Sequence, residues 1–353
     1  MNTIKLFLFT ITVAVVIFSS TSFTLAGERG KVTVNNADIV GAGATFPNPL
    51  YQRWIKEFAK IHPESAIFYD AVGSGEGTKR FMAQTVDFGA SDSAMTDEQI
   101  AQVKQGAQLV PVTAGSIVLA YNLPNISGEL RLSREVYADI FLGAITVWDD
   151  KRIQQLNPHL ALPRLNIITV SRSDSSGTTW AFTNHLHTIS RKWQESGYAV
   201  GKKIDWPGNS MVSRYNEGVA SAIKISLGSI GYVEYGIAKR AGLAMAALEN
   251  RAGEFISPSD TSGTTTLANN SAQMPKNLRM FLPDPEGKNS YPIITYTWLL
   301  LYKSYPEADK ARKIQQFIAW CLTQGQQYAA EYGYIPLPGS VVSAAQKGLE
   351  NVH

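Results

Sequence analysis

One stretch of the chain combines hydroxyl side chains, a glycine and a single arginine: residues 171–180, SRSDSSGTTW. It follows the strand-like run 165–170 and leads into a segment that can be helical. A loop at a helix start offers free backbone N–H groups, and together with hydroxyls and a guanidinium these can hold a tetrahedral oxyanion. An ordinary Ser/Thr helix cap beside an exposed Arg172 fits the same residues. Other parts of the sequence must distinguish the two interpretations.

Two further glycine-rich turns precede predicted helices, at residues 41–46 (GAGATF) and 73–77 (GSGEG). The first turn lacks the third glycine of the dinucleotide-binding fingerprint. The second is one residue short of a Walker A loop and has Lys79 in the wrong frame. We therefore interpret all three turns as groups of backbone donors rather than as nucleotide loops.

A catalytic serine is the main enzymatic alternative, because Ser74 and Ser176 both lie on strand-to-helix turns. Neither has the flanking glycines of a nucleophile elbow, and no histidine lies in these loops to act as a base. His185 and His187 are two residues apart on a predicted helix and point to different faces, which disfavours a shared metal site. We predict no catalytic residue, no metal ligand and no cofactor.

Asp92 is unusual among groups that donate hydrogen bonds to an anion, because a carboxylate repels a fully deprotonated anion. Two explanations stay open. Asp92 can cap a local Ser-Asp turn, or it can accept the proton of a monoprotonated ligand. Sulfate would leave that acceptor unpaired, at a cost of about several kcal/mol.

The 353 residues suffice for two domains, and 17% charged residues with a net charge of +3 describe a globular protein without a polyanion-binding surface. No nucleic-acid partner is therefore expected. Lys5, the apolar run 6–18 and small residues up to Ala26 predict a cleaved signal peptide over residues 1–26. That segment contains no Cys for a lipid anchor, and Cys321, the single cysteine, has no partner for an intramolecular disulfide. The sequence thus predicts a free periplasmic or secreted protein.

Strand-like and helical patterns alternate along the chain, which predicts an α/β fold whose first half has a largely parallel sheet. The intervals 197–209, 248–287 and 332–341 are expected to be mostly irregular, with one or two short helices in the second. The expected strands cover 37–40, 66–72, 86–90, 117–121, 165–171, 230–235 and 291–302, and the expected helices follow Pro47 or cover 78–84, 133–142, 216–225 and 306–324.

Four motifs occur in a characteristic order: GAGATFP at 41–47, VDFGASD at 86–92, SDSSGT at 173–178 and IGYVEY at 230–235. Together they closely resemble the phosphate-binding protein of the bacterial phosphate-specific ABC transporter. Their order and spacing match along nearly all of the mature chain. The segments 202–212 and 248–287 are least alike.

The resemblance implies a set of phosphate ligands. In that family the Phe of the first motif binds through its backbone N–H, the Asp closing the second accepts the ligand's proton, and the Arg is paired with a nearby Asp, here Asp174. Gly75 is a departure, since relatives often have a second Ser there. The implied ligands are Thr45, Phe46, Ser74, Asp92, Arg172, Ser176, Gly177 and Thr178.

The resemblance also implies a type II periplasmic binding protein fold, in which two α/β lobes close on a ligand in the cleft between them. Lobe I is expected to combine 27–113 with 291–353, and lobe II to be 114–290. The expected function is capture of inorganic phosphate in the periplasm by a monomer and delivery to the membrane permease of an ABC importer with its cytoplasmic ATPase. The alternatives are a receptor for another oxyanion, such as arsenate or sulfate, and an extracellular phosphatase. A surface or adhesion role cannot be read from sequence.

Overall fold

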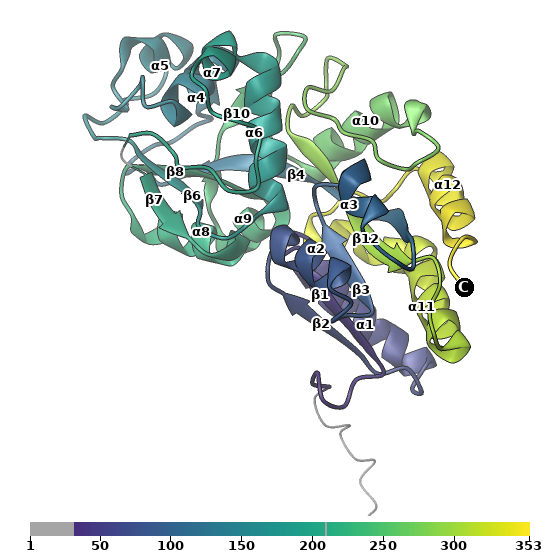
Figure 1. Ribbon diagram of the computed structural model, residues 1–353. Coiled ribbons are helices and arrows are strands. Elements are labelled where there is room, and N and C mark those ends of the chain that lie inside the picture. Colours follow the sequence, from purple (N-terminus) through teal and green to yellow (C-terminus); the bar gives the residue numbers. More distant parts are fainter. Residues whose placement is uncertain (1–31, 209) are drawn as a thin grey trace, which may run out of the picture. The chain divides into compact units, whose positions relative to one another are not determined.

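The computed structural model describes residues 32–208 and 210–353 (Figure 1). The predicted signal peptide, residues 1–26, lies outside the described residues. Within the described residues, one nine-stranded sheet runs in the order β2-β1-β3-β12-β4-β8-β6-β7, with β9 also paired to β4. Its strands are β1 (Ile39–Gly43), β2 (Ile67–Ala71), β3 (Phe88–Ser91), β4 (Ala107–Tyr121), β6 (Ile168–Arg172), β7 (Ser210–Ser213), β8 (Ser229–Glu234), β9 (Ala244–Met245) and β12 (Ile294–Tyr302).

The sheet has two halves that share β4. Residues 107–116 of β4 pair with β12, and residues 117–121 pair with β8. We call β2, β1, β3, β12 and the first part of β4 the first half. The second half consists of the rest of β4 with β8, β6, β7 and β9. One continuous strand therefore connects the two halves.

The sheet is mixed, so the expected parallel arrangement is only partly right. Strands β1, β2 and β3 are parallel in the first half, and β6, β7 and β8 are parallel in the second. The central strands β12 and β4 are antiparallel to their neighbours. The reason is that β12 returns to the first half from the end of the chain and enters between β3 and β4.

The sequence pattern predicted only 117–121 of β4, because Pro111 interrupts the preceding apolar run. The pairing register shifts between Thr297 and Trp298, which lies opposite Pro111. A proline, which has no N–H to donate, is tolerated at such an irregularity. The strand therefore continues through a residue that usually ends one.

The helices confirm most of the expected pattern, with some differences. Helix α2 begins at Ser74, four residues earlier than expected. The tail 332–341 is mostly irregular as expected, but its last three residues begin α12. The short edge strand β7 was not predicted. The helices are α1 (Asn48–Ile61), α2 (Ser74–Met82), α3 (Asp97–Ala101), α4 (Arg134–Phe141), α5 (Lys151–Leu156), α6 (Gly177–Ile189), α7 (Arg191–Glu195), α8 (Tyr215–Ile225), α9 (Tyr235–Ala241), α10 (Asp260–Asn270), α11 (Ala308–Leu322) and α12 (Gly339–Leu349).

Short elements complete the fold. Strands β5 (Arg131–Leu132), β10 (Ala247–Glu249) and β11 (Phe255–Ile256) form a small separate sheet. Short 3-10 helices cover Ser271–Gln273, Gln324–Tyr328 and Ala330–Tyr332. Helix α10 and the first of these turns fall in the interval 248–287, where one or two short helices were expected.

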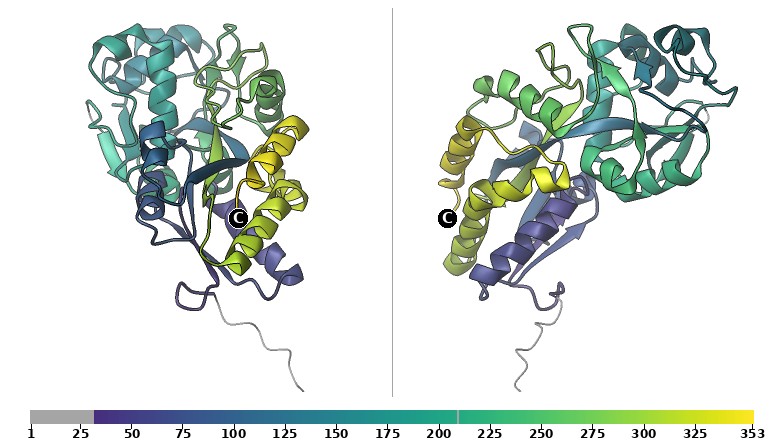
Figure 2. Two further views of the ribbon diagram at one scale, coloured as in Figure 1. Left: turned by 45° about the vertical axis from the view of Figure 1, so that its right-hand side comes forward. Right: turned by 180° about the vertical axis from the view of Figure 1, so that it is seen from behind.

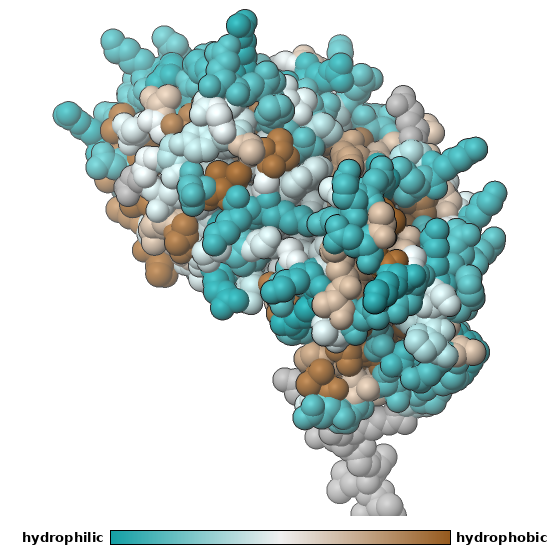
Figure 3. All heavy atoms as spheres, viewed as in Figure 1, coloured by the Kyte–Doolittle hydropathy of each residue, from teal (hydrophilic) through white to brown (hydrophobic). Residues whose placement is uncertain are grey.

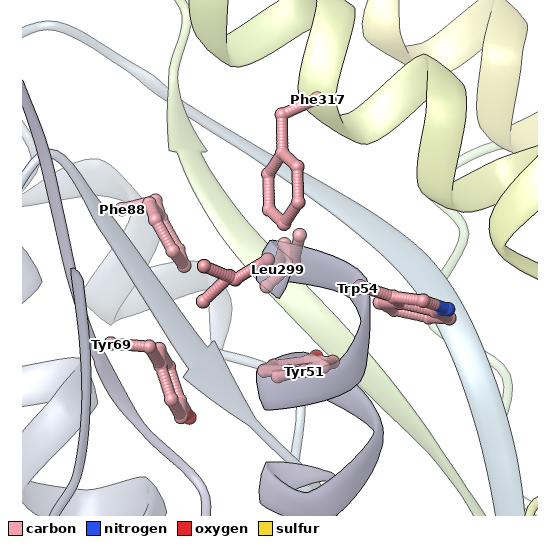
Figure 4. Close-up of a pocket in the computed structure, with 7 residues that line it drawn as sticks. Tyr51, Trp54, Tyr69, Phe88, Leu299 and Phe317 are labelled. Carbon is pink, nitrogen blue, oxygen red and sulfur yellow. The ribbon is translucent and has the colours of Figure 1, made fainter. Parts of the chain in front are cut away.

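Aromatic side chains fill the core beneath the first half. Helices α1 and α11, from opposite ends of the sequence, lie side by side there (Figure 2). Figure 4 shows the side chains that gather between these helices and the sheet. They are Tyr51 and Trp54 of α1, Tyr69 of β2, Phe88 of β3, Leu299 of β12 and Phe317 of α11. This packing fixes β1, β2 and β3, whose ends carry candidate site residues.

Hydrophilic residues dominate the face of the molecule shown in Figure 3, and hydrophobic residues appear there in small separate groups. In the part of the chain that the structure describes, no helix is both long and apolar enough to cross a membrane.

Candidate functional site

The carboxyl ends of the parallel strands carry the predicted site residues. In the first half, Thr45 follows β1, Ser74 follows β2 and Asp92 follows β3 directly. In the second half, Arg172 is the last residue of β6, and α6 starts five residues later. Ligands of open α/β sheets bind outside such carboxyl ends. The fold therefore brings together residues that are far apart in the sequence.

Two of the predicted loops are helix starts. Gly73 precedes α2 with a φ of 98°, a conformation that favours glycine, and a Cβ there would lie 2.7 Å from Oδ2 of Asp174. Ser176 caps α6, because its Oγ accepts a hydrogen bond from the backbone N–H of Thr179 at 3.1 Å. The hydroxyl hydrogen of Ser176 can still be donated to an anion. The capping and the binding interpretations of this loop are thus compatible.

The two halves touch at these loops. A Cβ on Gly177 would lie 2.5 Å from Oγ of Ser74 and 2.8 Å from Oδ2 of Asp92. The backbone N–H of Gly75 donates to the carbonyl of Ser175 at 2.9 Å. Residues of both halves therefore come into direct contact at these loops.

Arg172 is 2% exposed and is oriented by Asp174. Its Nε and Nη2 donate to the two carboxylate oxygens at 2.8 and 2.5 Å, and Nη2 also lies 3.3 Å from Oγ1 of Thr45. Nη1 is buried and has no hydrogen-bond partner among the described residues. A buried guanidinium nitrogen needs an acceptor, so Nη1 indicates a place for an anion.

Asp174 is held in its ionised form. Burial opposes ionisation, but the hydrogen bonds and the charge of Arg172 outweigh it, so the pKa of Asp174 lies below its ordinary value. The backbone N–H of Tyr215 also donates to Asp174 at 2.9 Å. Because this ion pair offsets the charge of Arg172, the guanidinium contributes direction more than net charge.

Asp92 is 1% exposed, and its carboxylate partners come from distant elements rather than from its own turn. Thr297 Oγ1 donates to Oδ1 at 2.7 Å, and Ser74 Oγ donates to Oδ2 at 3.2 Å. Burial raises the pKa of Asp92 to about 6, against the lowering effect of Thr297, Arg172 and Ser74. At neutral pH the carboxyl is therefore mainly ionised and able to accept a proton-bearing group.

The remaining predicted residues lie in the same place. Thr45 and Thr178 are both buried. Their hydroxyl oxygens accept hydrogen bonds from the same side-chain amide. The ring of Phe46 packs edge-on against Tyr334. The backbone carbonyl of Phe46 accepts a hydrogen bond from the Tyr334 hydroxyl at 2.6 Å. The side chain of Phe46 thus belongs to the core, and its backbone adjoins Thr45.

The sequence did not indicate Asn216, which supplies that amide. Its Nδ2 lies 3.2 Å from Oγ1 of Thr45 and 3.3 Å from Oγ1 of Thr178, and its Oδ1 accepts from the backbone N–H of Glu234 at 3.1 Å. One buried side chain therefore connects the first loop with the third. Asn216 appears in the sequence as an ordinary residue of a helical turn, so no local signal distinguishes it.

Thr297 and Lys202 were also missed. Thr297 lies in an apolar strand, where a second threonine two residues before it is the available sequence signal. The backbone carbonyl of Lys202 accepts a hydrogen bond from the backbone N–H of Ser176 at 2.8 Å. The positive charge of the Lys202 side chain lowers the pKa of Asp92. Lys202 also lines a cavity beside Gly75 and Ser175. It belongs to the segment that least resembles the suggested family.

The fold and the buried donors define a two-lobed α/β binding protein. In agreement, the family model described as a PBP superfamily domain matches residues 28–324. A solved structure with the same fold is the periplasmic phosphate-binding protein PfluDING bound with phosphate, at a TM-score of 0.73 and 22% identity over 88% of this chain and 93% of that chain.

Sequence relatives define the family more narrowly. The phosphate-binding protein PstS of Pasteurella multocida is 40% identical over 316 residues, which cover 89% of this chain and 90% of the relative. The PstS protein of Haemophilus influenzae is 40% identical over 308 residues, covering 86% and 90%. The chain therefore belongs to the PstS family of phosphate-binding proteins.

Proposed function

We propose that this protein captures inorganic phosphate in the periplasm with high affinity and delivers it to the membrane permease of an ABC importer. The observation that carries the proposal is Arg172, whose buried Nη1 finds no acceptor within the described chain although Asp174 fixes the rest of the guanidinium. The PstS relatives make phosphate the natural ligand for this place.

The proposed ligand shell draws on both halves of the sheet. Hydroxyl and backbone N–H groups, together with the start of α6, provide most of the stabilisation because Asp174 offsets the charge of Arg172. Asp92 accepts the proton that phosphate still carries. The proposed donors are Thr45, the backbone N–H of Phe46, Ser74, Arg172, Ser176, Gly177 and Thr178.

Calorimetric titration of the mature protein with phosphate, arsenate and sulfate at pH 7.5 tests this proposal. We expect tight binding of phosphate and much weaker binding of sulfate, since sulfate has no proton for the ionised Asp92. Arsenate carries a proton as phosphate does, so its affinity measures selection by size alone. Equal affinity for phosphate and sulfate would contradict the role given to Asp92.

We also propose that the lobes, residues 27–113 with 291–353 and residues 114–290, close on the ligand. The change of partner along β4, from β12 to β8, supports a connection in this region. Spin labels on Ile61→Cys and Ile225→Cys test closure, because both positions are exposed and Cys321 is buried. Phosphate is expected to shorten and narrow the distance distribution, and an unchanged distribution would contradict closure.

The remaining parts of the proposal concern processing, assembly and the absence of turnover. Secretion of the full-length chain in a bacterial host is expected to yield a periplasmic protein that begins at Gly27, measurable by mass spectrometry. Light scattering is expected to show a monomer. A chromogenic phosphate ester is expected to remain intact, because neither Ser74 nor Ser176 has a histidine partner: Ser74 donates to Asp92, and Ser176 accepts from a backbone N–H.

A further inference from the structure

Two threonines interrupt the apolar strand β12, whose sequence is ITYTWLLLY and whose nine residues are all buried. Thr295 and Thr297 are two residues apart and therefore point to the same face of the sheet. Buried hydroxyls need hydrogen-bond partners. Both find them at Asp92, because β3 ends beside β12, with Ser91 opposite Trp298.

The two threonines contact different parts of Asp92. Thr297 Oγ1 donates to the carboxylate oxygen Oδ1 at 2.7 Å. Thr295 Oγ1 donates to the backbone carbonyl of Asp92 at 3.0 Å. Only the first contact can influence the charge and the orientation of the carboxylate.

The contact with Thr297 assigns different tasks to the two carboxylate oxygens. Oδ1 is held by Thr297, while Oδ2 faces Oγ of Ser74 at 3.2 Å and the Cα of Gly177, where a Cβ would come within 2.8 Å. Oδ2 is thus the oxygen on the side of the anion loops. A hydroxyl that donates to a carboxylate also favours its ionised form.

We propose that Thr297 is a positioning residue: by holding Oδ1, it leaves Oδ2 to accept the ligand's proton and so sets the preference for protonated over unprotonated tetrahedral oxyanions. This inference rests on the proposed function. It assigns the selectivity to a pair of residues: Asp92, which follows β3, and Thr297 of the adjacent strand β12.

Other charged and titratable groups also face Asp92. Arg172 of β6 and Lys202 of the loop before β7 lower its pKa by their positive charges, while burial raises it to about 6. The phenols of Tyr51 and Tyr69 approach from α1 and β2, and burial, together with Asp92, raises their pKa well above the ordinary value. Both phenols stay neutral between pH 5.5 and 8.5, so Asp92 is the acidic group of this set that titrates there. Burial lowers the pKa of Lys202, while the charge of Asp92 raises it.

Replacing Thr297 by valine keeps the shape of the side chain and removes the donor. Loss of one charge-assisted hydrogen bond is expected to raise the proton affinity of Asp92 by about tenfold. The protonated fraction at pH 7 then rises from about one tenth to about one half. Protonated Asp92 can donate to a bare oxyanion, so we expect the affinity for sulfate at pH 7 to increase about fivefold.

The experiment is calorimetric titration with phosphate and with sulfate from pH 5.5 to 8.5. It compares the wild-type protein with Thr297→Val and with the matched control Thr295→Val, which removes a hydroxyl from the same strand but not from the carboxylate. In Thr297→Val, the pH at which sulfate affinity declines is expected to move up by about one unit. Thr295→Val is expected to keep the wild-type profile, and Thr297→Ser is expected to restore it.

The outcomes separate the inference from the proposed function. A wild-type protein that does not bind phosphate contradicts the proposed function itself. A wild-type protein that binds phosphate while Thr297→Val keeps its pH profile and its discrimination against sulfate overturns the inference. An equal shift in both valine variants also overturns it, because the cause is then strand packing. If Thr297→Val does not fold, Thr297→Cys, a much weaker donor, must shift the profile in the same direction.

Discussion

Arg172 shows how a single buried cation can be both fixed and available. Asp174 binds Nε and Nη2, which leaves the planar guanidinium in one orientation. Nη1 has no partner among residues 32–208 and 210–353. A lysine would keep the charge but could not span both carboxylate oxygens and an anion at once.

We therefore expect Arg172→Lys to weaken phosphate binding about 100-fold, through the loss of charge-assisted hydrogen bonds to the ligand. Calorimetry measures the affinity, and circular dichroism checks that the variant is folded. Arg312→Lys is the control, because Arg312 is 53% exposed on α11. Equal affinities in the wild-type protein and Arg172→Lys would show that the guanidinium does not contact the ligand.

Asn216 connects two hydroxyls that belong to different halves of the sheet. Its amide donates to Thr45 and to Thr178, and it is fully buried. Asn216→Leu is expected to lower phosphate affinity about tenfold, because the hydroxyls lose a common donor and their orientation. Stopped-flow measurement should place most of the change in the dissociation rate. If the association rate alone changes, Asn216 guides entry rather than holding the closed site.

At the scale of elements, the starts of α2 and α6 meet at Gly75 and Ser175. The backbone N–H of Gly75 donates to the carbonyl of Ser175. A Cβ at residue 75 would lie 1.9 Å from Oγ and 2.4 Å from Cβ of Ser175. Rotation of the Ser175 side chain cannot relieve the second contact. Glycine at 75 and serine at 175 are therefore matched.

Gly75→Ser is expected to push the two loops apart and to weaken phosphate binding about tenfold, a typical effect of overpacking. The double variant Gly75→Ser/Ser175→Gly is expected to recover most of the affinity, as calorimetry would show. Gly339→Ala is the control, since a Cβ there meets no atom within 4 Å. If the double variant binds no better than Gly75→Ser, steric conflict with Ser175 is not the cause.

At the scale of the whole molecule, the buried His185 makes stability depend on pH. It lies on α6, with Nδ1 2.5 Å from the carbonyl of Pro283 and Nε2 2.8 Å from the hydroxyl of Tyr137. Burial lowers the pKa of His185 to about 4. The unfolded chain takes up a proton near pH 6.5 while the folded protein does not, so this contribution is complete above pH 6.5 and is lost as the pH falls toward 4.

The loss amounts to about 3 kcal/mol of unfolding free energy over that interval. Burial raises the pKa values of Asp92 and Glu234 to about 6 and about 8, and these groups act in the opposite direction. The unfolding free energies of the wild-type protein and of His185→Gln, measured with urea, therefore have to be compared at each pH. The contributions of the other groups cancel in the difference. We expect the wild-type protein to lose stability relative to the variant below pH 6.5. A constant difference would mean that folded His185 is protonated.

The sequence could predict features that neighbouring residues encode. The glycine-rich turns at 41–46 and 73–77 and the Ser176 cap are local, since backbone conformation and capping depend on adjacent side chains. The same holds for most strands and helices. The missing part of β4 shows the limit, because Pro111 signals a break that packing overrides.

The sequence by itself determined the α/β class, predicted an anion-binding role for the loops and showed the unexpected presence of Asp92 among hydrogen-bond donors. Tertiary structure decided which residues act on those groups. Thr297 and Asp92 are hydrogen-bonded although 205 positions separate them in the sequence, and Asn216 and Thr45 are hydrogen-bonded across 171 positions. No local sequence pattern encodes a contact between residues so far apart in the chain. The physical reason is that a hydrogen bond depends on positions in space, which the sheet order sets when β12 enters between β3 and β4.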